Sequence, residues 1–403
     1  MEPGRLILIA GALLAAGVVA SLLAHRFRFP ALVLLLALGM AIGSDGTGWI
    51  DFGNRPEDYE LTLLIGTIAL AVILFEAGLA AGLSEIRPVL RPSIGLALVG
   101  TVGTAAVAGL AAVWLFELPF LEGMLLGSIL AASDGAAVFA ILRGSRLRRR
   151  LARTLVGEAG LNDPVAVLLV LGLIELITDP DASLGDVLLL FIQELAIGTA
   201  VGLGLGWLVV QGMRRVSSAP AGLQLVASFT GAALAYGAAD VLHGSGFLAV
   251  FLAGLVFGSS DVPNRGPTRA FHEGLSSVAE IALFFTLGLL VFPGQLDDVL
   301  VEGTLLALIV AFVARPLAAT LATALDRFSA RERLLLGWAG LRGGVPVVLA
   351  TFPVIAGVPH SLEFFNIAFF AVLLSTLIQG TSLEPLARRL GLMGDDPAVV
   401  APS

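Results

Sequence analysis

Long apolar stretches separated by short polar segments run the whole length of this chain, and they restrict its fold more than any other feature. Of its 403 residues, 57% are hydrophobic and only 13% are charged, and the mean hydropathy is +0.97. The charged share is about half of the ~25% that is usual in soluble domains. A water-soluble fold of this length could not bury so much apolar surface, so we expect an integral membrane protein.

The apolar stretches predict about 13 transmembrane helices and an all-α fold. A helix needs roughly 20 apolar residues to cross a bilayer, and fewer where surrounding protein buries its ends. We expect the first to remain as an uncleaved helix, because it has the length of a full span. The predicted spans cover residues 6–24, 29–42, 61–79, 94–116, 120–142, 155–177, 187–210, 223–242, 247–258, 278–291, 305–324, 334–355 and 364–378.

Charge alternates between successive loops. The chain has no lysine, and clusters of arginine follow the odd-numbered spans, as in residues 143–153, whereas loops such as 179–186 are acidic. Positively charged loops stay in the cytoplasm, which predicts an outside N-terminus and a cytoplasmic C-terminus. We therefore expect a multi-pass protein of the cell (inner or plasma) membrane, in contact with the lipid bilayer.

A faint internal repeat divides the chain. Residues 39–44 (GMAIGS) resemble 254–259 (GLVFGS), and 75–79 (FEAGL) resemble 285–289 (FTLGL). We predict inverted six-helix repeats over about 5–178 and 218–392, joined by a linker helix over about 185–212. Chance similarity between Gly-rich apolar segments is the alternative. Residues 1–403 then form a single transmembrane domain, and we expect no cytoplasmic regulatory domain in this chain.

Two spans at corresponding positions of these repeats are interrupted. The fifth is broken by Ser133-Asp134-Gly135, and the twelfth by residues 341–346, which include Arg342. Interrupted, crossing helices in the two halves of a transporter mark a binding site near the bilayer midplane. The exposed ends of half-helices carry partial charges, which Asp134 and Arg342 would complement.

The sixth span carries the ionisable residues Glu158 and Asp163, together with Asn162 and Pro164. A charged group inside a span costs on the order of 3 kcal/mol, so its presence requires a reason. Burial favours the neutral form of a carboxylate, so protons and cations would compete for Asp163. The alternative is that Asp163 merely pairs with an arginine as part of the scaffold.

Arg315 lies in the middle of the eleventh span, where a buried guanidinium requires a carboxylate. Glu158 and Glu76 are the candidates, and we favour Glu158; a water-filled vestibule around Arg315 is the alternative. Cysteine is absent and all four histidines fall at span ends or loops, which argues against an enzyme and against a resident metal centre. We expect no cofactor and no nucleic acid partner.

The residues also resemble a known family. Residues 131–139 (AASDGAAVF) and 158–164 (EAGLNDP), with 244–250, 287–293 and 340–343, look like the NhaP-type branch of the sodium/proton exchanger superfamily. Nearly the whole chain is similar, most closely to the potassium/proton antiporters called cell volume regulation protein A. This chain has Ser-Asp-Gly at the first break, where many relatives have Thr-Asp-Pro, and Ala159 where relatives often have serine.

The resemblance implies a thirteen-helix homodimer in which a core domain moves against a dimer domain. It implies that Asp163 binds proton or cation alternately, that Asn162 supports it, and that Ser133 and Asp134 line the site. It also implies an ion pair of Glu158 with a buried arginine, Arg315 or Arg342.

We thus predict an antiporter exchanging Na⁺ or K⁺ for H⁺ by alternating access. The Asn-Asp pair and the missing lysine resemble electroneutral exchangers. The transported cation, at Asp163 and Asp134, is the only metal expected. The rival functions are a cation channel or uncoupled cation pathway, a membrane-embedded enzyme, and an organic-solute transporter.

Overall fold

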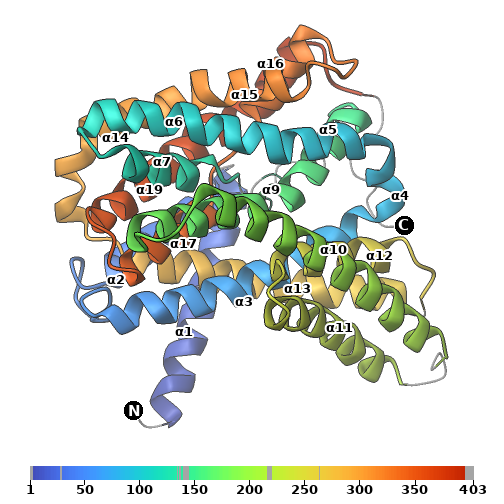
Figure 1. Cartoon of the computed structure of the whole chain (residues 1–403). Coiled ribbons are helices and arrows are strands. Elements are labelled where there is room, and N and C mark those ends of the chain that lie inside the picture. The colour runs from blue at the N-terminus through green and yellow to red at the C-terminus, as the bar shows by residue number, and fades with distance from the viewer. Residues whose placement is uncertain are drawn as a thin grey trace.

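The computed structural model describes residues 3–27, 30–133, 135, 138, 145–215, 220–262 and 264–394. Within these ranges the regular structure is helical, apart from an isolated antiparallel bridge between Leu147 and Met393 (Figure 1). The all-α class predicted from the apolar stretches is therefore confirmed for this part of the chain.

Seven helices in the described part of the chain are long and apolar enough to cross a membrane. They are Pro56–Ala81 (α3), Leu83–Phe116 (α4 to α6), Arg149–Thr178 (α9), Leu184–Arg215 (α10), Ala221–Val241 (α11), Leu300–Ala322 (α14 and α15) and Ser361–Arg389 (α19 and α20). Shorter apolar helices are Ala10–Ala24 within α1 (Pro3–Phe27), α2 (Ala31–Ile42), α7 (Phe120–Ala131), α12 (Gly246–Gly258) and Gly344–Ile355, which joins α17 (Gly344–Leu349) and α18 (Thr351–Ile355). With α13 (Arg265–Leu289) and α16 (Ala330–Trp338), every predicted span has a helical counterpart.

Three of the long helices contain a turn of π-helix. Leu96–Gly100 lies between α5 (Leu90–Gly95) and α6 (Thr101–Phe116), and Val310–Ala314 lies between α14 (Leu300–Ile309) and α15 (Arg315–Ala322). The third, Thr376–Gly380, joins α19 (Ser361–Ser375) to α20 (Thr381–Arg389). A π turn rotates the residues that follow it, and such turns are frequent at functional sites. The first packs against α15, which begins with Arg315.

Two glycine-lined helix crossings have the same form. A Cβ added to Gly39 of α2 would overlap the backbone of α13 at Phe285 and Gly288, and one added to Gly254 of α12 would overlap α3 at Phe75. Small residues let the helix backbones approach closely in this way. The predicted repeat pairs Gly39 with Gly254 and α3 with α13, so the two crossings are equivalent contacts. This equivalence agrees with an internal repeat, whose inverted orientation stays a prediction.

The helices differ greatly in their burial. In the most apolar stretch of α9, 56% of residues are buried, but in that of α10 only 11% are. The outer face of α10 exposes large apolar side chains such as Leu188, Ile192 and Trp207. An apolar outer face is what a bilayer requires. Figure 1 shows α9 inside the bundle, with α6, α14 and α15 on one side and α3, α11 and α13 on the other.

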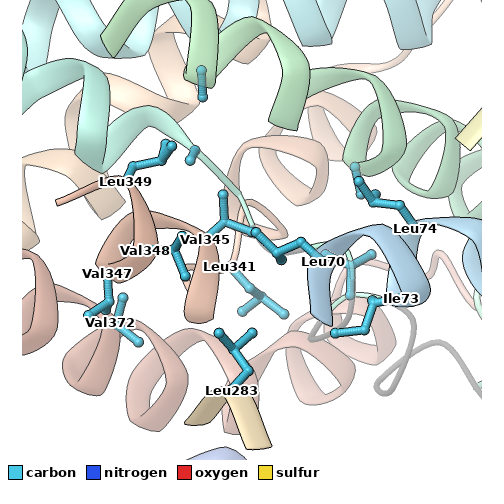
Figure 2. Close-up of a cluster of buried hydrophobic side chains, with 14 of the residues drawn as sticks. Leu70, Ile73, Leu74, Leu283, Leu341, Val345, Val347, Val348, Leu349 and Val372 are labelled. Carbon is cyan, nitrogen blue, oxygen red and sulfur yellow. The ribbon is translucent and has the colours of Figure 1, made fainter. Parts of the chain in front are cut away.

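The twelfth span is interrupted at a slightly different place from the prediction. Residues 339–343 are the non-helical ones, and α17 begins at Gly344, so Pro346 lies inside its first turn. Proline is tolerated there because the first backbone N–H groups of a helix have no intrahelical acceptor. Figure 2 shows the apolar side chains around α17: Leu70 of α3 and Leu283 of α13 lie beside Val345 and Val348, and Ile73 lies further along α3.

Candidate functional site

The candidate site is built on α9, which carries three buried polar side chains. Glu158, Asn162 and Asp163 are 2%, 0% and 3% exposed, although the helix crosses an apolar bundle. Asp163 is thus enclosed by protein and does not face lipid. Pro164 lies directly after it inside the continuous helix, where its missing N–H leaves one backbone carbonyl without its usual donor.

The first interruption lies against this part of α9. Helix α7 ends at Ala131, Ala132 is extended, and the Oγ of Ser133 accepts a hydrogen bond from the Nδ2 of Asn162. Further along, Gly135 faces the backbone of Ala159. The Oδ1 of Asn162 has no hydrogen-bond partner among the described residues, and so it is available to a ligand. Asp134, predicted to line the site, lies outside the described residues.

Arg342 joins the second interruption to the first. It is 2% exposed, and its Nε donates to the carbonyl of Leu130, in the last turn of α7, at 3.0 Å. Its Nη1 donates to the carbonyl of Gly340. The last carbonyls of a helix lack intrahelical donors and carry partial negative charge. Arg342 therefore complements the end of one broken helix from within the break in the other.

A buried ion pair lies in the same region. The Nη2 of Arg315 contacts the Oε1 of Glu158, and their side chains are 1% and 2% exposed. Arg315 is thus paired with Glu158, the partner we favoured. Such a pair is strongly destabilised when one partner is lost, because the other becomes an uncompensated buried charge. Its role in transport stays a prediction.

Gly340 connects the ion pair to the second interruption. A Cβ on this residue would overlap the guanidinium of Arg315, while its carbonyl accepts from Arg342. Glycine is the one residue that lets the chain pass so close to a guanidinium. Gly340 therefore contacts Arg315 on one side and Arg342 on the other, and the ion pair of Arg315 with Glu158 links this interruption to α9.

The comparison with protein families agrees with this arrangement. Residues 11–389 match the family model described as sodium/hydrogen exchanger, transmembrane. The chain belongs to the sodium/hydrogen exchanger family. This membership confirms the family predicted from the sequence and places the chain among membrane transporters.

Several relatives of this exchanger are similar over most of its length. It is 40% identical over 388 residues to the K⁺/H⁺ antiporter NhaP of Alkalimonas amylolytica, covering 96% of this chain and 67% of that protein. It is 39% identical to the K⁺/H⁺ antiporter NhaP2 of Shewanella sp. (strain ANA-3), covering 94% of this chain and 66% of that one. The exchanger therefore spans about two thirds of the length of these relatives.

A solved structure has the same fold. The sodium proton antiporter MjNhaP1 from Methanocaldococcus jannaschii, at pH 8, superposes on the exchanger with a TM-score of 0.83 at 25% identity. The superposition covers 97% of this chain and 99% of that one. This likeness confirms the predicted all-α membrane fold with interrupted helices.

Sequence reasoning missed a row of polar residues on α19 of the exchanger and on the π turn after it. The Oγ of Ser375 accepts from the backbone N–H of Arg342 at 3.0 Å, and the Oγ1 of Thr376 donates to its carbonyl at 3.1 Å. The Nε2 of Gln379 donates to the carbonyl of Trp338 at 3.0 Å. These side chains satisfy backbone groups that the break in the twelfth span exposes. Gln379 follows Ser375 by one helical turn within an apolar stretch, a signal that could have found them.

Proposed function

We propose that this exchanger is a secondary active antiporter that moves a monovalent cation, Na⁺ or K⁺, against H⁺, with Asp163 as the shared binding group. The observation that carries the proposal is that both interruptions contact one segment around α9. Asn162 bonds to Ser133 at the first, and Arg342 ties the second to the end of α7. Asp163 is buried beside these contacts.

The donor atoms around Asp163 suit an alkali cation. A carboxylate, the Oδ1 of Asn162 and the Oγ of Ser133 are hard oxygen ligands, and Asp134 would add a second carboxylate. A proton on Asp163 removes the same single charge that a bound monovalent cation offsets. The two then bind in turn and not together, which couples their fluxes.

The charge balance favours a one-for-one, electroneutral exchange. Glu158 is compensated by Arg315, and Arg342 is held by backbone carbonyls, so none of these residues needs to change its charge during a cycle. The charge change is then confined to Asp163 and its ligand, so the loaded and the protonated sites carry the same net charge.

Alternating access requires two bodies that move relative to each other. We propose that α4 to α9 and α14 to α20 form the moving core, and that α1 to α3 and α10 to α13 form the body against which it moves. Apolar contacts join the two across α3 and α17, where Gly66 faces Val348. A continuous channel is disfavoured because the relatives at 39–40% identity are antiporters. We further propose a homodimer, with an outside N-terminus and a cytoplasmic C-terminus.

Flux through proteoliposomes with an internal pH-sensitive dye tests the assignment. Asp163→Asn should abolish cation-driven proton movement, whereas Glu175→Gln, a half-buried carboxylate on the same helix, should retain it. K⁺ should be tried first, then Na⁺ and Li⁺, because the relatives at 39–40% identity are K⁺/H⁺ antiporters. Proton-coupled exchange that survives in Asp163→Asn would refute the role of this carboxylate.

A further inference from the structure

A cavity separate from the proposed exchange site lies among the ends of α6, α14 and α19, which gather at the left of Figure 1. It has a volume of about 460 Å³, and its lining includes the carboxylates Glu117, Glu302 and Glu363. Glu117 follows the end of α6, Glu302 lies in the first turn of α14, and Glu363 in that of α19. We call this space the acidic cavity.

The three carboxylates of the acidic cavity have no ion pair with any residue that the structure describes. At the arginine-rich end of the molecule the carboxylates are paired: Glu85 contacts Arg149 at 3.1 Å, and Glu332 lies 3.9 Å from Arg148. Like charges that share one cavity repel each other, so the acidic cavity attracts cations from solution.

A buried amide faces the same space. Asn366 of α19 is only 7% exposed, and its side chain has no hydrogen-bond partner among the described residues. It lines both the acidic cavity and an adjoining one of about 580 Å³, as does Gln295. The amide oxygen of Asn366 can therefore accept a hydrogen bond from a ligand in the cavity.

The chemistry of the cavity points to an organic cation. A metal ion needs several ligands converging on one point, and no group of three acidic, histidine or cysteine side chains among the described residues is close enough to hold one. The carboxylates instead surround a volume that is many times the ~30 Å³ share of one water molecule. Between the carboxylates, the cavity wall is formed by the apolar side chains of Val299 and Leu362. A ligand with separate positive charges joined by an apolar chain would fit such a site.

We propose that the acidic cavity binds linear aliphatic polyamines, cations whose ammonium groups are separated by methylene chains. Their ammonium groups lie at Glu117, Glu302 and Glu363, and donate hydrogen bonds to the amide oxygens of Asn366 and Gln295. Their methylene groups lie against Val299 and Leu362. This site belongs to α6, α14 and α19 and does not include Asp163, so it is distinct from the proposed exchange site.

Isothermal titration calorimetry with spermidine, on the detergent-solubilised chain in ~0.15 M KCl to screen diffuse charge effects, tests the proposal. We expect saturable binding with one ligand per chain, weakened at least ~10-fold in the Glu302→Gln/Glu363→Gln double variant. Asn366→Ala should also weaken it. Glu57→Gln, an exposed carboxylate of α3 outside the acidic cavity, is the matched control and should leave binding unchanged.

Three outcomes would overturn the proposal: no spermidine binding by the wild-type chain, equal weakening by the control variant, or full displacement of spermidine by equimolar Mg²⁺. The last result would identify a compact divalent-cation site. A thermal melt of each variant checks that it is folded, and the single Glu302→Gln variant replaces the double variant if the latter is not. Because the readout is binding, the result does not depend on whether the chain exchanges ions.

Discussion

The ion pair between Glu158 and Arg315 makes a quantitative prediction about stability. Both side chains are at most 2% exposed, so the loss of either partner leaves a charge that water cannot reach. Removing one member of a buried pair costs ~3–5 kcal/mol, whereas replacing both with apolar residues of similar volume is often close to neutral. Arg315 is the more sensitive of the two to the loss of its partner, because its Nε and Nη1 have no hydrogen-bond acceptor among the described residues.

We therefore expect Glu158→Leu and Arg315→Met each to lower the free energy of unfolding by ~3–5 kcal/mol, and the double variant to lose less than either single variant. Denaturant unfolding in detergent micelles gives the four values of this cycle. The exposed pair Arg388–Glu384, in contact at 2.5 Å, is the control and should show a coupling below ~1 kcal/mol. Additive effects at Glu158 and Arg315 would show that the pair contributes no mutual stabilisation and that our reasoning is wrong.

Two further substitutions test the contacts that hold the interrupted helices. Gly340→Ala places a methyl group against the Arg315 guanidinium and should destabilise the fold by ~1–3 kcal/mol and slow exchange. Gly212→Ala, which has open space around it, should do neither. Equal melting temperatures of the two variants would contradict the close approach at Gly340. Ser133→Ala leaves the Nδ2 of Asn162 without its acceptor, so we expect the free energy of unfolding to fall by ~1–3 kcal/mol. The cation concentration for half-maximal flux should also rise. An unchanged concentration for half-maximal flux would exclude Ser133 from the site.

Much of the fold could be predicted from the sequence because a bilayer imposes simple length rules. An apolar run either is long enough to cross or is not, and every predicted span has a helical counterpart in the structure. The pairing of Arg315 was predictable for a related reason. A buried guanidinium needs a carboxylate, and Glu158 and Glu76 were the two candidates.

The partners of Arg342 could not be predicted in the same way. It is held by the carbonyls of Leu130 and Gly340, and backbone carbonyls are present at every position of a sequence. Only the three-dimensional path of α7 shows which of them lack donors. The acidic cavity was hidden for a similar reason, because Glu117, Glu302 and Glu363 lie far apart in the sequence and meet only when α6, α14 and α19 pack together.

The contacts between helices also explain how this bundle could move without unfolding. Gly78 and Gly254 bring the backbones of α3 and α12 into direct contact, as Gly39 and Gly288 do for α2 and α13, and such contacts do not slide because one backbone sits in a groove of the other. Between α3 and α17, by contrast, the side chain of Val348 packs over Gly66, and Val348 belongs to the apolar cluster of Figure 2. Apolar contacts are non-directional. If α17 shifts, its apolar side chains can therefore form new contacts with α3 in place of the old ones. In the proposed cycle the binding group would move with the helices that hold it, because Arg342 and Asn162 join both interruptions to α7 and α9 on the same side of that surface.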